Sequence, residues 1–99
     1  MTTTESEAAA PVLPIGQVKW RSHVRVKGRI RSIRVQPWAE VASLEATVID
    51  PTGGLVLIFL GRRTVPGVEL GRHVIAEGMA GEHRGYLAIL NPVLELLDH

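Results

Sequence analysis

Hydrophobic and polar residues alternate most regularly in residues 18–36. Every second position from 19 to 31 carries Lys, Arg or His, and the positions between them are mostly apolar. Because side chains of a strand point alternately to its two faces, this pattern predicts a strand with one apolar and one cationic face. After Ile30 the alternation shifts by one residue, and Gly28 just before it permits a bulge or a bend. The first strand is therefore expected to be long, bent and able to pair in two parts of a small barrel.

The next two strands form a predicted hairpin. Residues 42–50 alternate again, and residues 55–60 are apolar throughout. The segment between them has a Pro that favours the first corner of a turn, followed by glycines that accept positive φ. The uninterrupted apolar run predicts that the third strand is covered on both faces.

Two more strands follow a break in the alternation. Residues 61–71 contain a Pro-Gly pair, whereas residues 72–81 and 86–90 return to strand patterns, and residues 93–97 are expected to stay extended or to coil. This order predicts an all-β, five-stranded OB-fold Greek-key barrel, with a short helix or loop between strands 3 and 4. An SH3-like barrel is the rival, and the position of the connector favours the OB-fold.

Composition predicts one small domain with an N-terminal tail. Residues 1–15 are rich in Thr, Ala, Glu and Pro without periodicity, which indicates a disordered tail, and residues 16–99 fit a single OB-fold domain. The chain has no Cys, its N-terminus lacks the apolar segment of a signal peptide, and its longest apolar run is too short to span a membrane. A soluble cytoplasmic protein without membrane contact is therefore expected.

Positive charge is concentrated in one segment, although the formal net charge is only +1. Seven of the 11 Lys and Arg residues fall between Lys19 and Arg34. One interpretation is that they line a groove that follows the phosphate backbone of a nucleic acid. The alternative is a solvated strand face that protects a sheet edge from aggregation. Like charges about 7 Å apart on one strand face repel each other, which favours a bound anion, although Glu45 is a candidate to neutralise them.

Two of the few aromatic residues are candidates for stacking on nucleic-acid bases. Trp38 lies in a predicted loop that flanks the binding face of OB barrels, so its indole either stacks on a base or folds back over the barrel end. Tyr86, after the turn between the fourth and fifth strands, is a second candidate. Trp20 and Phe59 are expected in the core, because Trp20 shares the parity of the apolar positions and Phe59 lies in the apolar third strand.

Loop arginines add to the candidate contacts. Arg62 and Arg63 directly follow the third strand, and they either continue the basic surface or solvate the loop. Arg84 lies beside Glu82 in the turn between the fourth and fifth strands. We expect it to be an ordinary turn residue rather than one that clamps a bound nucleic-acid strand. The residues predicted to bind nucleic acid are Lys19, Arg21, Arg25, Lys27, Arg29, Arg31, Arg34, Trp38, Arg62 and Tyr86.

The sequence shows no catalytic or metal-binding pattern. The 4 His residues lack ligand spacing and have no Cys partner. No Ser-His-Asp arrangement or pair of carboxylates indicates a catalytic cleft. We therefore expect no catalytic residues, no metal site, no cofactor and no enzyme activity.

Residues of the predicted hairpin resemble those of bacterial OB-fold domains. The second and third strands of these domains follow a D-x-T-G-x-L-x-L-x-F pattern, which is matched here by Asp50, Thr52, Gly53, Leu55, Leu57 and Phe59. Their fourth strand has a further pattern that is matched by Leu70, Gly71, Val74 and Gly78.

The end of the fifth strand extends this resemblance. Residues 85–92, GYLAILNP, are similar to the corresponding segment in the wedge domain of RecG-type branch-migration helicases. Related OB modules occur in replicative polymerases and aminoacyl-tRNA synthetases. The resemblance implies a stand-alone OB module that binds nucleic acid, and because the sequence lacks a G-x-x-x-x-G-K-[ST] phosphate loop, no helicase motor is expected.

Together these patterns predict a non-enzymatic OB-fold protein that binds single-stranded or junction DNA or RNA through the basic first strand and the loop aromatics. If about four phosphates of a single strand are neutralised, affinity should fall with salt with a log–log slope near −3. The alternative is a protein-interaction module whose cationic strand docks an acidic partner, because a fold does not fix a function.

Overall fold

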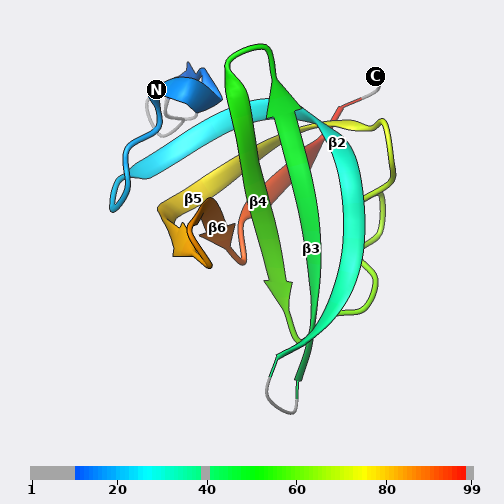
Figure 1. Ribbon diagram of the computed structural model, residues 1–99. Coiled ribbons are helices and arrows are strands. Elements are labelled where there is room, and N and C mark those ends of the chain that lie inside the picture. Colours follow the sequence, from blue (N-terminus) through cyan, green and yellow to red (C-terminus); the bar gives the residue numbers. More distant parts are fainter. Residues whose placement is uncertain (1–10, 39–40, 98–99) are drawn as a thin grey trace, which may run out of the picture.

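The described part of the chain consists almost entirely of strands. The computed structural model describes residues 11–38 and 41–97 of the 99 residues. Its elements are β1 (Val12–Leu13), a single 3-10 turn η1 (Ile15–Gln17), β2 (His23–Trp38), β3 (Val41–Asp50), β4 (Gly53–Leu60), β5 (His73–His83), β6 (Tyr86–Leu90) and β7 (Val93–Leu96). Figure 1 shows β3 and β4 as a long hairpin, with β2 curving along one side of it. Within these described ranges, no helix has the length and apolar character needed to cross a membrane.

Five strands of the described ranges close into a barrel, and two short described strands lie outside this ring. Hydrogen-bonded neighbours follow the order β2-β3-β4-β6-β5, and β5 pairs back onto β2. The pairing of β4 with β6 is parallel, and the other pairings of the ring are antiparallel. β1 adds to β2, and β7 adds to β5. This strand order, with a loop in residues 61–72 between β4 and β5, confirms the predicted five-stranded OB-fold barrel.

β2 is shared by both halves of the barrel. Residues 23–29 pair with β5, and residues 29–38 pair with β3. The register shifts between Ile30 and Ser32, so Arg31 is the extra residue of a bulge. This confirms the long, bent strand and the predicted change of parity, with the bulge at Arg31 rather than at Gly28.

The strand begins later than predicted. Residues 18–22 lie outside any strand, and Arg21 has a φ of 67°. Arg21 N donates a hydrogen bond to Ala80 O at 2.7 Å, and Ala80 N donates one to Ser22 O at 2.8 Å. Because the chain turns here, the alternation of the sequence does not place side chains on two sheet faces. The core position predicted for Trp20 is therefore wrong, and its side chain is 55% exposed.

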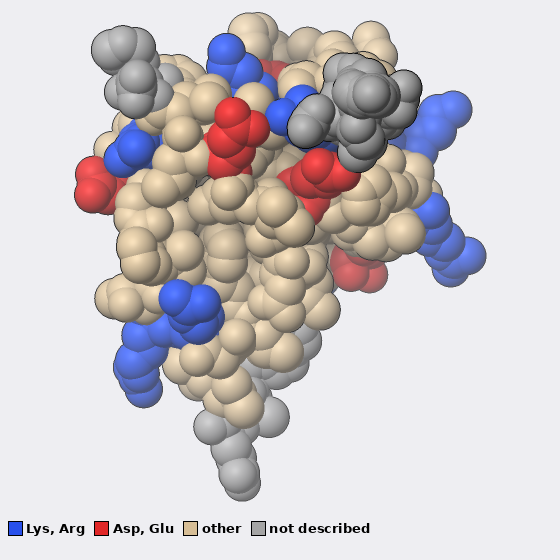
Figure 2. Space-filling view, turned by 180° about the vertical axis from the view of Figure 1, so that it is seen from behind, with Lys and Arg blue, Asp and Glu red and all other residues tan. Residues whose placement is uncertain are grey.

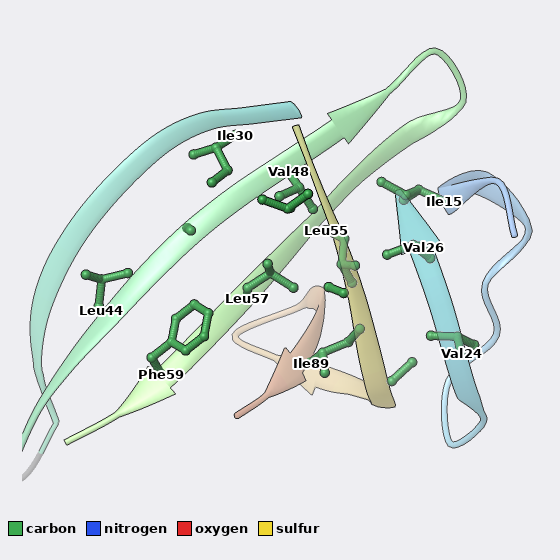
Figure 3. Packing of buried hydrophobic residues seen from close by; sticks show 14 residues of the cluster. Ile15, Val24, Val26, Ile30, Leu44, Val48, Leu55, Leu57, Phe59 and Ile89 are labelled. Atoms are coloured by element: carbon green, nitrogen blue, oxygen red, sulfur yellow. The ribbon is translucent and has the colours of Figure 1, made fainter. Parts of the chain in front are cut away.

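Inward-facing apolar side chains from every strand of the ring form the core. Figure 3 shows how they meet inside the barrel, and they include Val24, Val26, Ile30, Leu44, Val48, Leu55, Leu57, Phe59, Val74, Ala76 and Ile89. The predicted burial of Phe59 is confirmed. Residues 57–59 of β4 are buried on both faces, as predicted, whereas Leu60 at the end of the strand is 40% exposed. Burial of each large side chain contributes about 1.5–3 kcal/mol, so the core determines which residues of each strand face outward.

The N-terminal segment is attached to the turn between β3 and β4. β1 pairs in parallel with β2, and Ile15 is buried in the core. Asp50 Oδ2 accepts a hydrogen bond from Ile15 N at 2.9 Å, and Thr52 Oγ1 accepts one from Gly16 N at 2.8 Å. These contacts begin before residue 16, the predicted start of the domain, while residues 1–10 of the predicted tail lie outside the described residues.

Candidate functional site

The outer face of strands β2, β3 and β4 carries a groove. Inward and outward side chains alternate, so Ser32, Thr47 and Val56 stand in one outward row across the three strands. An open groove of about 910 Å³ follows this face and is also lined by the β3–β4 turn and the β5–β6 turn. In OB barrels, this face and its flanking loops bind oligonucleotides and oligosaccharides.

Three arginines and a tyrosine line this groove. Arg31 is placed there by the bulge of β2, and Arg34 follows on the same strand. Arg84 and Gly85 form the two-residue turn between β5 and β6, with φ of 55° and 84°, which is typical of a type I′ hairpin. This turn brings Arg84 and the 67% exposed Tyr86 to the groove. The site therefore combines cations with an exposed ring, which are the groups that contact phosphates and bases.

Two acidic residues, Glu45 and Asp50, line the groove together with these cations. Glu45 stands opposite Arg34 in the β2–β3 register, and its Oε2 lies 3.7 Å from Nε2 of His83. Arg34 Nε instead donates to the amide oxygen of Gln36 at 2.9 Å, with the amide oriented to satisfy this contact. No described carboxylate forms an ion pair with any of the three groove arginines. Glu45 therefore reduces the positive charge of the groove without forming an ion pair with any of its three arginines.

The first half of β2 presents a different surface. Arg25 Nε lies 3.8 Å from Glu77 Oε1, and its Nη2 lies 3.2 Å from Glu95 Oε1. His23 Nε2 lies 2.9 Å from Glu77 Oε2. The prediction of one continuous cationic face along the first strand is wrong here, because β5 and β7 place two carboxylates beside Arg25.

The other predicted cations are spread over the barrel. Lys27 and Arg29 line a second, smaller hollow on the outer face. Lys19 and Arg21 precede β2, Arg62 is exposed in the loop after β4, and none of these three lines the groove. Figure 2 views the molecule from behind and shows a largely uncharged middle, with basic side chains toward the margins.

Trp38 and Arg84, two candidate contacts near the ends of strands, differ in whether the structure places them at the groove. Trp38 is the last residue of β2, but its side chain lies outside the described part of the structure. Arg84 lines the groove although the sequence favours ordinary turn chemistry for it. The turn is shaped by Glu82, whose carboxylate accepts a hydrogen bond from Gly85 N. The useful signal in the sequence is the Arg-Gly pair between two strands, since OB topology places this turn beside the binding face.

A carboxylate organises the β3–β4 turn next to the groove. Asp50 Oδ1 accepts hydrogen bonds from Thr52 N at 2.7 Å, Thr52 Oγ1 at 2.6 Å and Gly53 N at 3.1 Å, in addition to the bond from Ile15 N to Oδ2. Burial alone would raise the pKa of Asp50, but these hydrogen bonds to the charged form outweigh burial and lower the pKa below its usual value. Asp50 therefore stabilises the turn as an ionised group.

Comparisons with known proteins support the fold. No family model and no curated protein matches this sequence. The structure is similar to the solution structure of a replication factor A related protein from Methanobacterium thermoautotrophicum, with a TM-score of 0.65 over 89% of this chain and 92% of that chain. The two sequences are 17% identical, so this likeness shows a shared fold. It does not single out the wedge domain of RecG-type helicases.

Proposed function

We propose that this chain is a non-enzymatic OB-fold module that binds single-stranded or junction nucleic acid in the groove of β2, β3 and β4. The observation that carries the proposal is that three arginines and the exposed Tyr86 line one groove, on the face that OB barrels use for oligonucleotides. Oligosaccharides bind the same face in other OB barrels, but three cations without ion pairs among the described carboxylates favour a polyanion.

The residues of the groove suggest how a single strand is held. Guanidinium groups form paired hydrogen bonds with phosphate oxygens, which suits Arg31, Arg34 and Arg84 to backbone contacts. Neutralising three phosphates of a single strand predicts a log–log salt slope near −2. Stacking of a base on Tyr86 would add about 1–3 kcal/mol and is tolerant of sequence, so we expect weak sequence preference.

The likeness to a solved structure supports this proposal at the level of the fold. The similar structure is that of a replication factor A related protein, so the same barrel occurs in a protein named for replication. The resemblance to the wedge domain of RecG-type helicases and a cytoplasmic location stay predictions.

The test is fluorescence anisotropy with labelled single-stranded DNA and RNA of mixed sequence, titrated at several salt concentrations. Wild-type protein should bind with an affinity that falls as salt rises. Because Arg31 and Arg34 are both exposed, the double variant Arg31→Gln/Arg34→Gln should fold normally. Its affinity at low salt should fall by about tenfold or more, and the magnitude of its salt slope by about 1.4, because two phosphate contacts are lost.

A matched control removes the same charge elsewhere. Arg62→Gln/Arg63→Gln changes two exposed loop residues that do not line the groove, so its affinity should stay close to that of the wild type. Equal losses in the groove and loop variants would show that only overall charge matters, and the groove proposal would be wrong. Absence of binding to any oligonucleotide at low salt would also overturn it and would favour the alternative of an acidic protein partner.

A further inference from the structure

A second hollow lies on the outer face of the barrel, where β2 pairs with β5. It has a volume of about 530 Å³ and is lined by Lys27, Arg29 and His73. Lys27 and Arg29 are two residues apart on β2 and share its outer face, and His73 is the β5 partner of Arg29. No carboxylate in the described ranges forms an ion pair with these three side chains. Asp50 also lines the hollow, and its charge offsets part of the positive charge of Lys27 and Arg29, although its oxygens already accept the hydrogen bonds of the β3–β4 turn.

The second hollow adjoins the groove. Ile49, Asp50 and Pro51 line both. Along β2, Arg29 of the second hollow is followed by Arg31 at the bulge, which lines the groove. Cationic side chains thus continue from residue 27 to residue 34 of one strand, over about 20 Å at roughly 3.3 Å per residue. This length exceeds what a single phosphate needs and suits a segment of several nucleotides.

Acidic residues limit this surface at one end. The outward cation before Lys27 is Arg25, which contacts the carboxylates of Glu77 and Glu95. These two carboxylates would repel a phosphate placed beyond Lys27. The cationic surface therefore has a defined end at Lys27 and continues only toward the groove.

We infer that Lys27 and Arg29 form a second phosphate-binding site, which continues the groove and lengthens the segment of nucleic acid that the protein holds. This inference rests on the proposed function of the groove. His73 also lines this hollow, and its buried Nδ1 forms no hydrogen bond with the described residues. A short oligonucleotide fills the groove, whereas a longer one also reaches Lys27 and Arg29.

The test compares two lengths of single-stranded oligonucleotide, about 4 and about 12 nucleotides, which span the usual site sizes of OB barrels. The variant Lys27→Gln/Arg29→Gln changes two exposed residues and should leave the fold intact, as thermal unfolding can verify. Its affinity for the longer oligonucleotide at low salt should fall by about tenfold, and the magnitude of the salt slope by about 1.4, because two phosphates are no longer neutralised. Its affinity for the shorter oligonucleotide should equal that of the wild type.

The remaining outcomes separate this inference from the function on which it rests. If the wild type binds neither length, the proposed function fails and the second site fails with it. If the wild type binds both lengths and the variant binds both equally well, the groove stands and the second site is wrong. Equal losses for both lengths, or an equal loss in the control Arg62→Gln/Arg63→Gln, would also reject a separate second site.

Discussion

At the scale of single residues, Asp50 connects the N-terminal segment to the wall of the groove. Its carboxylate accepts hydrogen bonds from Ile15, Thr52 and Gly53, so both the η1 turn and the β3–β4 turn depend on one side chain. We predict that Asp50→Ala lowers the free energy of unfolding by about 1–3 kcal/mol, because the backbone N–H groups of Ile15, Thr52 and Gly53 lose a charged acceptor. Urea unfolding measures this change, and an unchanged midpoint would contradict it.

The same residue gives a dependence on pH with a definite sign. The pKa of Asp50 is lowered in the folded state from its usual value of 3.8, so its stabilising effect is fully present above that value. The effect is lost as pH falls through the lower, folded-state pKa. The difference in unfolding free energy between wild type and Asp50→Ala should therefore be constant near neutral pH and shrink below about pH 4. A difference that grew on acidification would reject this assignment.

At the scale of elements, the path of β2 requires a close approach between strands at Gly28. A Cβ at this position would lie 2.8 Å from the backbone oxygen of Ile49 and 3.3 Å from its backbone nitrogen. We predict that Gly28→Ala destabilises the protein by about 1–3 kcal/mol, because the backbone of β3 must move.

A second glycine provides the control for this prediction. Gly81 also lies in a strand, β5, but a Cβ there would meet nothing within 4 Å. Gly81→Ala should therefore be neutral or slightly stabilising, since it only reduces the freedom of the unfolded chain. Thermal unfolding of both variants tests the comparison, and equal melting temperatures would show that the contact at Gly28 is easily relieved.

β2 also shows how far the sequence predicts this structure. Alternation identifies its faces from His23 onward, and the change of parity after Ile30 indicates the bulge, because both follow from local geometry. The alternation continues through residues 18–22, but there the backbone turns at Arg21, so parity misplaces Trp20. The lining of the groove is harder to predict, because Arg84 reaches it only through the β5–β6 turn. The ion pairs of Arg25 are equally hard to predict, because the pairing of β2 with β5 and of β5 with β7 determines which carboxylates lie beside it.

At the scale of the whole molecule, the net charge is only +1, but positive and negative side chains lie on different parts of the surface. Cations follow the outer face of β2 from Lys27 to Arg34, and the carboxylates Glu77 and Glu95 lie beyond one end. Long-range repulsion from these acids should weaken binding of a strand that extends past Lys27.

We predict that Glu95→Gln strengthens binding of the longer oligonucleotide by about two- to fivefold at low salt, as expected for one exposed charge. The matched variant Glu69→Gln removes the same charge from an exposed position in the loop between β4 and β5, and it should have a smaller effect. Anisotropy titrations with the longer oligonucleotide compare the affinities of the two variants. Equal gains would mean that the position of the acid is unimportant, and the gain should disappear at high salt in any case.

The pairing of β2 with both β5 and β3 has a consequence for how this protein can diversify. One strand closes the barrel through its inward side chains and backbone and presents the cations on its outward side, so the two tasks fall on alternate residues. The turns at Asp50 and Arg84 border the groove without closing the ring. Adaptation to a new ligand should therefore accumulate first in the turn at Arg84 and on the outward residues of β2, while Asp50 and the inward residues of β2 change slowly.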